Sequence, residues 1–334
     1  MTDLSIIVPV YNVEKYIRTC MESVFQQGLD ESRFEVIIVN DGSTDRSMEM
    51  IADFIRQHTN ITVINQTNQS LSVARNVGIA KAKGEYILMP DSDDLLIENS
   101  LKPLLEKALK TKADLVVADF LEMYDEEIEQ LQGISNTDSS FTEKTGKALF
   151  LEDLNPYQCY VWRTLFRRQF LIDENLAFIP RLRYQDVPFT HECYLKAGKC
   201  LRTHRLLNIY RKGRLGSATA AFSKQKAMEF CIVIAKTWEL THMEGLSDAE
   251  LRKLKEDIYT SFSTMMYSVL HSMKDRSEQL LIIRYLNELA PDLRFMNNIH
   301  QKVETFLFSK ASRCYLALHR LHWKWIRRNH RTDK

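Results

Sequence analysis

The sequence predicts a doubly wound, mostly parallel α/β sheet flanked by helices and followed by an α-helical C-terminal domain. Three observations lead to this prediction. Short β-branched apolar runs alternate with segments of helical spacing as far as residue 119, which is typical of crossovers between parallel strands. Gly and Pro number only 10 and 7 in 334 residues, too few for a turn-rich β architecture. From residue 224 onward helical spacing dominates, which indicates a separate bundle.

The expected strands are short and almost wholly apolar, as in a sheet covered on both faces. They comprise residues 4–10, 34–40, 61–65, 85–90 and 114–119. Helices are predicted over residues 13–27, 43–56, 71–83 and 97–110, the second of them capped by Ser43 or Thr44. Residues 122–140 are acidic and weakly periodic, so we interpret them as a loop. In the C-terminal region a predicted helix face carries Ile258, Phe262, Met265 or Met266, and Val269.

Composition excludes several classes of protein. The formal net charge is +1, which argues against a surface built for nucleic acid. The six cysteines are scattered without zinc-ligand spacing, so we expect reduced thiols. The apolar run at the N-terminus has about seven residues, far below the roughly 20 that span a bilayer. We therefore expect a cytoplasmic protein without nucleic-acid partners.

Polar segments follow the predicted strands: PVYN, VNDGSTD, NQTNQS and PDSDD. In doubly wound sheets, ligands bind where the carboxyl ends of the strands meet. Asp91, Asp93 and Asp94 place three carboxylates within four residues, and carboxylate oxygens suit Mg²⁺ or Mn²⁺. The alternative is that these residues merely cap a helix that begins near Leu95.

Two nucleotide-binding motifs are absent from the sequence. The turn after the first strand, YNVEKY, contains no glycine, so it lacks the dinucleotide pattern G-x-G-x-x-G, and no G-x-x-x-x-G-K-[ST] occurs either. A nucleotide bound at these strand ends would need another way to neutralise its phosphates. A divalent metal ion is the natural candidate.

Four ordered motifs together resemble the family 2 glycosyltransferases, which have the GT-A fold. They are SIIVPVYNVEKYI, VNDGSTDRS, TNQSLSVARNVGIAKAKGEYILMPDSDD, and LFRRQFL with RYQDVPF, spread over roughly residues 4–217. The resemblance implies inverting transfer of a sugar from a nucleotide-diphosphate donor, usually a UDP-sugar, to an acceptor hydroxyl. It also implies a divalent metal and, for a chain of this kind, a role in surface polysaccharide synthesis.

The resemblance implies roles for the donor side of the site. The base pocket would be lined by Pro9 and Tyr11, with Asp41 accepting a hydrogen bond from uracil. The nucleotide or its phosphates would contact Asn68 and Arg75. A late Tyr-Arg…Ser motif, with Ser217 as its serine, would bring Arg211 to the diphosphate. Asp93 would be the main metal ligand, and Asp91 would bind the ribose, the donor sugar or the metal.

On the acceptor side the resemblance implies that Asp186 is the catalytic base. The family has Glu before this aspartate, whereas this chain has Gln185, which removes a charge and can still orient an acceptor. Trp162 could form a platform for a sugar, although a packed core tryptophan is an equal alternative. His191 and His204 are weaker candidates for further metal ligands.

We place the domain boundary near residue 222. Residues 1–94 form the expected nucleotide-binding half and residues 95–222 the acceptor-binding half of the first domain, and residues 223–334 form the helical domain. Residues 309–334 carry eight Lys or Arg and one Asp, so this tail has a charge of +7 and the rest of the chain −6. An apolar helical seam is predicted along it at Leu307, Ala311, Cys314, Leu318, Leu321 and Trp325.

The basic tail predicts peripheral contact with the anionic inner face of a membrane, where lipid-linked acceptors occur. Trp323 adds a further interfacial side chain. The alternative is a solvated face on a helix packed in the bundle or against a second copy of the chain. For the whole protein two other functions stay open: a nucleotidyltransferase, and a non-catalytic protein that binds sugar nucleotides or acts as a scaffold.

Overall fold

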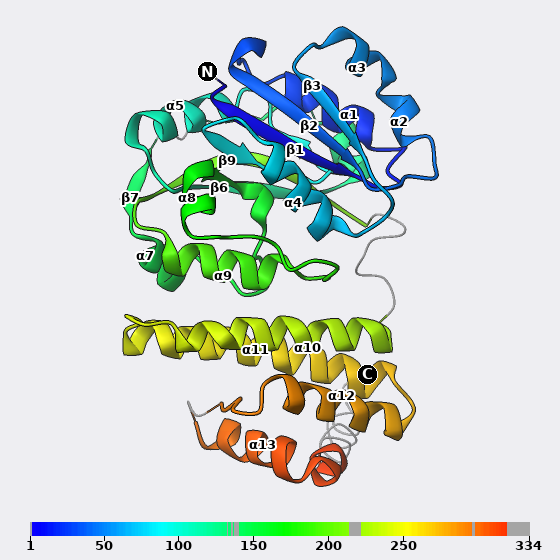
Figure 1. Cartoon of the computed structure of the whole chain (residues 1–334), viewed down its shortest axis with the longest axis vertical. Helices are drawn as coiled ribbons and strands as arrows, with labels where there is room; N and C mark the ends of the chain where they lie inside the picture. The colour runs from blue at the N-terminus through cyan, green and yellow to red at the C-terminus, as the bar shows by residue number, and fades with distance from the viewer. Residues whose placement is uncertain are drawn as a thin grey trace. The chain divides into compact units, whose positions relative to one another are not determined.

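The structure is a computed structural model that describes residues 2–131, 133–134, 136, 140–213, 222–295 and 298–318. The chain forms two compact units, Met1–Ser217 and Ala218–Lys334. The first combines a sheet with helices and the second contains helices, as Figure 1 shows from blue to green and from yellow to red. The predicted class, an α/β domain followed by a helical region, is confirmed.

One nine-stranded sheet forms the centre of the first unit, as far as its residues are described (Figure 1). Its order is β3-β2-β1-β4-β8-β6-β9-β5, with β7 paired to β9. Strands β3, β2, β1 and β4 are parallel, whereas β8 runs antiparallel to both β4 and β6. The strands are β1 (Leu4–Val10), β2 (Phe34–Asn40), β3 (Ile61–Asn65), β4 (Tyr86–Leu88), β5 (Leu95–Leu96), β6 (Leu115–Tyr124), β7 (Thr142–Lys144), β8 (Thr164–Arg167) and β9 (Cys200–Lys212).

Helices cover both faces of this sheet. They are α1 (Ile17–Phe25), α2 (Ser47–Met50), α3 (Ala52–Gln57), α4 (Leu71–Lys81), α5 (Leu101–Thr111), α6 (Asp125–Glu129), α7 (Gly146–Glu152), α8 (Arg168–Asp173) and α9 (Asp186–Lys196). The core beside α1 and α5 includes Ile6 and Val8 of β1. Helix α4 packs close to β1, because a Cβ on Gly78 would lie only 2.3 Å from Ile7 Cγ2.

Two local predictions in this unit are wrong. The helix expected over residues 43–56 is broken into α2 and α3, and neither Ser43 nor Thr44 caps it. Both residues instead bond to Asn12, which ties the loops after β1 and β2 together. The loop expected over 122–140 begins as regular structure, because β6 continues along β9 as far as Tyr124 and α6 follows it.

The second unit contains α10 (Lys224–Glu239), α11 (Asp248–Ser272), α12 (Arg276–Leu289) and α13 (Ile299–Lys310). A short 3₁₀ turn follows α10 at Leu240–His242, and two others lie in the first unit, at Glu31–Arg33 and Val161–Arg163. The predicted apolar face of α11 is confirmed, because all five of its residues are buried: Ile258, Phe262, Met265, Met266 and Val269. No helix in the described residues is both long enough and apolar enough to cross a membrane.

The seam predicted along the C-terminal tail is wrong within the described residues. Helix α13 ends at Lys310, and Ala311 has φ −139°. The side chains that are buried here are those of Phe308, Tyr315 and Leu316, whereas Cys314 and Leu318 of the predicted seam are exposed. A break in the helix rotates the stripe, so one face does not continue through it. The rest of the predicted seam and basic stripe, residues 319–334, lies outside the described residues.

Candidate functional site

Asp41, at the end of β2, organises the loop that follows β3. Its buried carboxylate accepts hydrogen bonds from Gln66 Nε2 at 2.6 Å, from the Gln69 amide at 2.8 Å and from the Ser70 amide at 2.9 Å. Ser70 has φ +95°, a backbone conformation that residues other than glycine rarely adopt. These bonds hold the strained turn in place, so the loop has a defined shape.

The other residues predicted to bind the nucleotide base lie at the same sheet edge. Pro9 is buried in β1, and Tyr11, which follows β1, is 46% exposed. Gly42 has φ +74°, and a Cβ there would lie 2.9 Å from the backbone nitrogen of the exposed Asn68. Glycine at this position therefore lets the loops after β2 and β3 approach each other beside an open aromatic ring.

Three carboxylates follow β4. Ligand atoms of Asp91, Asp93 and Asp94 all lie within 4.8 Å of one another. Asp94 is buried, and its Oδ2 has no hydrogen-bond partner among the described residues. Hard oxygen donors at this spacing, one of them buried and unsatisfied, fit a divalent cation such as Mg²⁺ or Mn²⁺.

Arg211 of β9 holds the turn that carries these carboxylates. Its backbone amide donates to Asp94 Oδ1 at 2.8 Å, and its Nε donates to the Asp93 carbonyl at 2.8 Å. Its Nη1 pairs with Asp125 of α6, and its guanidinium lies 4.8 Å from the ring centre of Tyr16. The guanidinium is thus engaged within the protein in this structure. Ser217, the last residue of the Tyr-Arg…Ser motif, lies outside the described residues.

Arg75 of α4 connects the carboxylate cluster to Asp186, the first residue of α9. Its side chain is completely buried, with Nη2 2.7 Å from Asp91 Oδ1 and Nη1 2.6 Å from Asp186 Oδ1. From the sequence we expected this arginine to contact the nucleotide or its phosphates. Here both of its terminal nitrogens bind carboxylates that are 16 and 111 residues away along the chain.

Burial dominates the electrostatics of these carboxylates. It raises the pKa of Asp91 to about 6, a rise that Arg75 opposes and that Asp93 and Asp186 increase. Burial also raises the pKa of Asp186, again opposed by Arg75. The pKa of Asp94 is raised well above its usual value by burial and by the charges of Asp93 and Asp91. A cation bound in the cluster would favour the ionised carboxylates and lower these pKa values.

On the acceptor side, Trp162 lies within a group of aromatic rings. Trp162 is only 1% exposed, with Tyr160 and Tyr210 stacked near it at 4.7 and 5.8 Å and Phe120 edge-on at 4.9 Å. Other rings cover the indole, which agrees with the alternative of a packed core tryptophan. The rings of Phe120, Tyr160 and Tyr210 are all half-buried, and of these we did not predict Tyr160 from the sequence.

Gln185 precedes α9 and is buried, and its Oε1 has no hydrogen-bond partner among the described residues. The two weaker candidates for metal ligands, both histidines, bond to groups outside the carboxylate cluster. His191 is fully buried with Nδ1 2.7 Å from the Val187 carbonyl, and the exposed His204 pairs with Asp119. Neither histidine belongs to the group of possible metal ligands found in the described chain.

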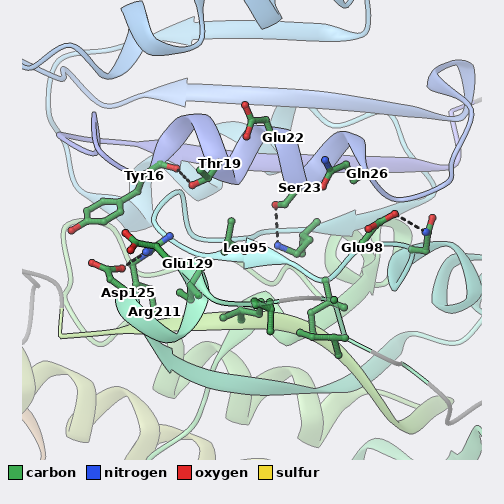
Figure 2. A pocket seen from close by; sticks show the side chains of 18 of the residues that line it. Tyr16, Thr19, Glu22, Ser23, Gln26, Leu95, Glu98, Asp125, Glu129 and Arg211 are labelled. Atoms are coloured by element: carbon green, nitrogen blue, oxygen red, sulfur yellow. Dashed lines mark hydrogen bonds and ion pairs between the residues drawn. The ribbon is translucent and has the colours of Figure 1, made fainter.

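A cavity of about 1140 Å³ borders the cluster on the side of Arg211. Figure 2 shows one side of it, where Tyr16 from before α1, Asp125 from α6 and Arg211 from β9 lie close together. The described residues that line it include neither Asp91 nor Asp186. This cavity is therefore distinct from the space between the carboxylates. Asp125 was missed because its acidic run was interpreted as a loop, although an acidic first helical turn is itself a helix-start signal.

Comparison with known proteins identifies the family. Residues 5–172 match the family model described as Glycosyl transferase family 2. The chain belongs to this family. The matched stretch contains Asp41, Arg75 and the carboxylate cluster of this family 2 chain, and it ends before Asp186.

Several relatives carry glycosyltransferase names. An uncharacterized glycosyltransferase of Bacillus subtilis, EpsJ, is 34% identical over 212 residues, 63% of this chain and 61% of the relative. GlyG of Streptococcus pneumoniae is 29% identical over 75% of this chain and 84% of the relative. The chain spans about three fifths of the length of EpsJ and of YibD from Escherichia coli.

A solved structure of residues 1–349 of Staphylococcus aureus TarS, in complex with UDP-GlcNAc, superposes with a TM-score of 0.76. The match covers 98% of this chain and 92% of the TarS chain at 20% identity. At this identity the likeness shows the fold. The predicted GT-A fold with a helical C-terminal region is therefore confirmed.

Proposed function

We propose that this family 2 chain is a metal-dependent, inverting glycosyltransferase that moves a sugar from a UDP-sugar to a hydroxyl of a glycan or lipid-linked acceptor, in surface polysaccharide synthesis. The observation that carries the proposal is the link from the carboxylates after β4 through Arg75 to Asp186. Names among the comparisons support it: a poly(ribitol-phosphate) beta-glucosyltransferase of Bacillus spizizenii, and a Pyrobaculum calidifontis mannosyltransferase solved with GDP-Man and Mn²⁺.

The donor binds, in this proposal, to the half formed by residues 1–94. Tyr11 offers an exposed ring for stacking on the base beside Pro9, and Asn68 stands on the loop that Asp41 shapes. Asp41 already accepts three hydrogen bonds, so an N–H of uracil would share an oxygen with the loop amides.

Asp93 and Asp91 would hold the divalent cation. The chemistry that such a cation supplies when bound is neutralisation of the negative charge on the departing diphosphate. Arg211, which now pairs with Asp125, could add a second positive charge if that ion pair opened. Positive charge held by these two acidic ligands, together with the guanidinium, would thus favour departure of the diphosphate without a glycine-rich phosphate loop.

Asp186 is the proposed general base. Its Oδ1 is held by Arg75, its side chain is 25% exposed, and its Oδ2 receives no hydrogen bond from the described residues. Asp186 would take the proton of the acceptor hydroxyl while the hydroxyl oxygen forms a bond to the anomeric carbon. The bond from that carbon to the diphosphate oxygen breaks on the opposite side, which inverts the configuration.

The acceptor would lie against the half formed by residues 95–222. Gln185 is buried, so its unsatisfied Oε1 would accept a hydrogen bond from a sugar hydroxyl only after a local movement that opens the site. Tyr160, one of the half-buried rings beside Trp162, is the proposed apolar contact in place of Trp162.

The proposal is tested by incubating the purified chain with a panel of UDP-sugars and glycan acceptors, and recording UDP release and the anomeric configuration of the product. We expect an inverted product that disappears on chelation of divalent metal. Asp93→Asn and Asp186→Asn should each lose transfer by about 10²–10⁴-fold. The control Asp173→Asn changes an exposed carboxylate at the end of α8, which accepts a hydrogen bond from Gln169, and should keep full activity. Transfer that persists without metal, or a retained configuration, would refute the proposal.

A further inference from the structure

Arg75 joins two carboxylates that have different proposed tasks. Asp91 belongs to the donor-side cluster, and Asp186 is the proposed base. We propose that Arg75 is a positioning residue, which orients the base toward the acceptor and fixes its distance from the donor-side cluster, rather than a ligand of the donor phosphates. This inference rests on the proposed function and adds a coupling between its two halves.

The position of Arg75 is fixed from several sides. Its guanidinium carbon lies 5.3 Å from the ring centre of Phe178. The next residue, Asn76, donates to the Phe178 carbonyl at 2.7 Å and accepts from the Phe178 amide at 2.9 Å. Helix α4 also approaches β1 closely at Gly78. A guanidinium held in this way sets the positions of the carboxylates that it binds.

Only arginine satisfies both carboxylates at once. A guanidinium presents several N–H groups in a planar fork, so Nη1 and Nη2 each reach a different acid. An ammonium group is a compact charge on a flexible stem and would approach one acid more closely than the other. Replacement by lysine therefore keeps the charge and removes the fixed geometry.

One atom indicates that stability alone does not explain this arrangement. Arg75 Nε is buried and has no hydrogen-bond partner among the described residues. An unsatisfied buried polar group destabilises a protein, and a buried ion pair contributes little net stability. Costly arrangements of this kind occur mainly at functional sites, where a specific geometry is needed, and rarely in parts of a protein that serve only for packing.

The two carboxylate oxygens of Asp186 have different partners. Oδ1 is bound to Arg75, so the carboxylate cannot rotate freely, and Oδ2 is left for the acceptor hydroxyl. Each Nη of Arg75 has a second N–H, but the side chain is completely buried, so a phosphate could reach it only if the side chains around it moved. Positioning and direct phosphate binding therefore predict different kinetic effects.

The test compares Arg75→Lys with the matched control Arg163→Lys, which alters another largely buried arginine, paired with Asp119 outside the cluster. Transfer is measured against donor concentration, and UDP binding is measured by calorimetry. We expect Arg75→Lys to lower kcat about 10–100-fold with the Kd of UDP changed less than about threefold, and Arg163→Lys to leave kcat within about threefold. Circular dichroism checks that both variants are folded.

A double-mutant cycle separates action through the base from other effects. In the Asp186→Asn background, Arg75→Lys should lower the residual kcat less than about twofold, because the base on which Arg75 acts is already lost. Equal kcat losses in both backgrounds, or a loss confined to donor affinity, would overturn the inference while the proposed function stands. If the wild-type chain transfers no sugar from any donor, the proposed function fails and this inference falls with it.

Discussion

Gly78→Ala is the sharpest probe of how α4 is placed. A Cβ at this position would lie 2.3 Å from Ile7 Cγ2 and 3.1 Å from Ile7 Cγ1, and Ile7 is fully buried. Favourable carbon contacts lie near 3.5–4.0 Å, so the shortfall exceeds about 1 Å and the helix must move. Overpacking of a core costs about 1–3 kcal/mol, whereas Ala in place of Gly in a helix contributes about 1 kcal/mol.

Since the clash is severe, we take the upper end and expect a net destabilisation of about 2 kcal/mol. Urea unfolding followed by circular dichroism measures this destabilisation. If the two units unfold in separate transitions, the transition of the α/β unit is the one that Ile7→Ala shifts, because Ile7 lies in β1. Gly198→Ala is the control, because its Cβ would lie at an ordinary 3.5 Å from Asp114 Oδ2. Its stability should stay within about 0.5 kcal/mol of wild type.

A cycle with Ile7→Ala completes the experiment. Ile7→Ala removes Cγ2 and Cγ1, the two atoms nearest to the added Cβ, and alone it should cost about 2–5 kcal/mol. In that background Gly78→Ala should no longer destabilise, which gives a stabilising coupling of about 1–3 kcal/mol. Because Arg75 lies one turn before Gly78, the single Gly78→Ala variant should also lose transfer activity. A Gly78→Ala protein as stable as wild type would refute this account of the packing.

Three further predictions concern other regions of the chain. Tyr11→Ala should weaken UDP binding by about 1–3 kcal/mol in calorimetry, whereas Tyr11→Phe, which keeps the stacking face, should bind as wild type does. Hydrogen bonds from the Ser277 amide and hydroxyl, with other local bonds, lower the pKa of Asp275 below its usual 3.8. The ionised carboxylate therefore caps and stabilises α12 at neutral pH, and this stabilisation is lost as the pH falls below about 4. The difference in thermal stability between wild type and Asp275→Ala should accordingly shrink from about pH 6 to about pH 3. Deletion of residues 319–334, which spares the buried Tyr315, should abolish flotation of the chain with anionic vesicles, and equal recovery of both proteins would exclude the tail as a membrane contact.

The sequence predicted the parallel half of the sheet well. The expected ranges 4–10, 34–40 and 61–65 coincide with β1, β2 and β3, because these apolar runs are bounded by polar turns and need no distant partner to be recognised. Strand β9 was missed. Its sequence, CLRTHRLLNIYRK, mixes charged and apolar residues, and it is a strand because it pairs with β6, which lies far from it along the chain.

The candidate site shows the same division. The carboxylates of Asp91, Asp93 and Asp94 are adjacent in sequence, so their grouping could be predicted from spacing. The bridge from Arg75 to Asp186 depends on how α4 and α9 meet, which local patterns do not encode. The burial of Trp162 likewise depends on rings from distant segments.

The central claim is that a nucleotide-diphosphate sugar binds with a divalent cation at the ends of β1 to β4. Calorimetric titration of UDP, with and without Mn²⁺, into wild type, Asp93→Asn and the exposed-surface control Asp173→Asn tests it most directly. We predict binding that strengthens at least about tenfold with Mn²⁺ in wild type and in the control, and loses that enhancement in Asp93→Asn. Equal UDP affinity with and without the metal, or an enhancement that survives in Asp93→Asn, would contradict the claim.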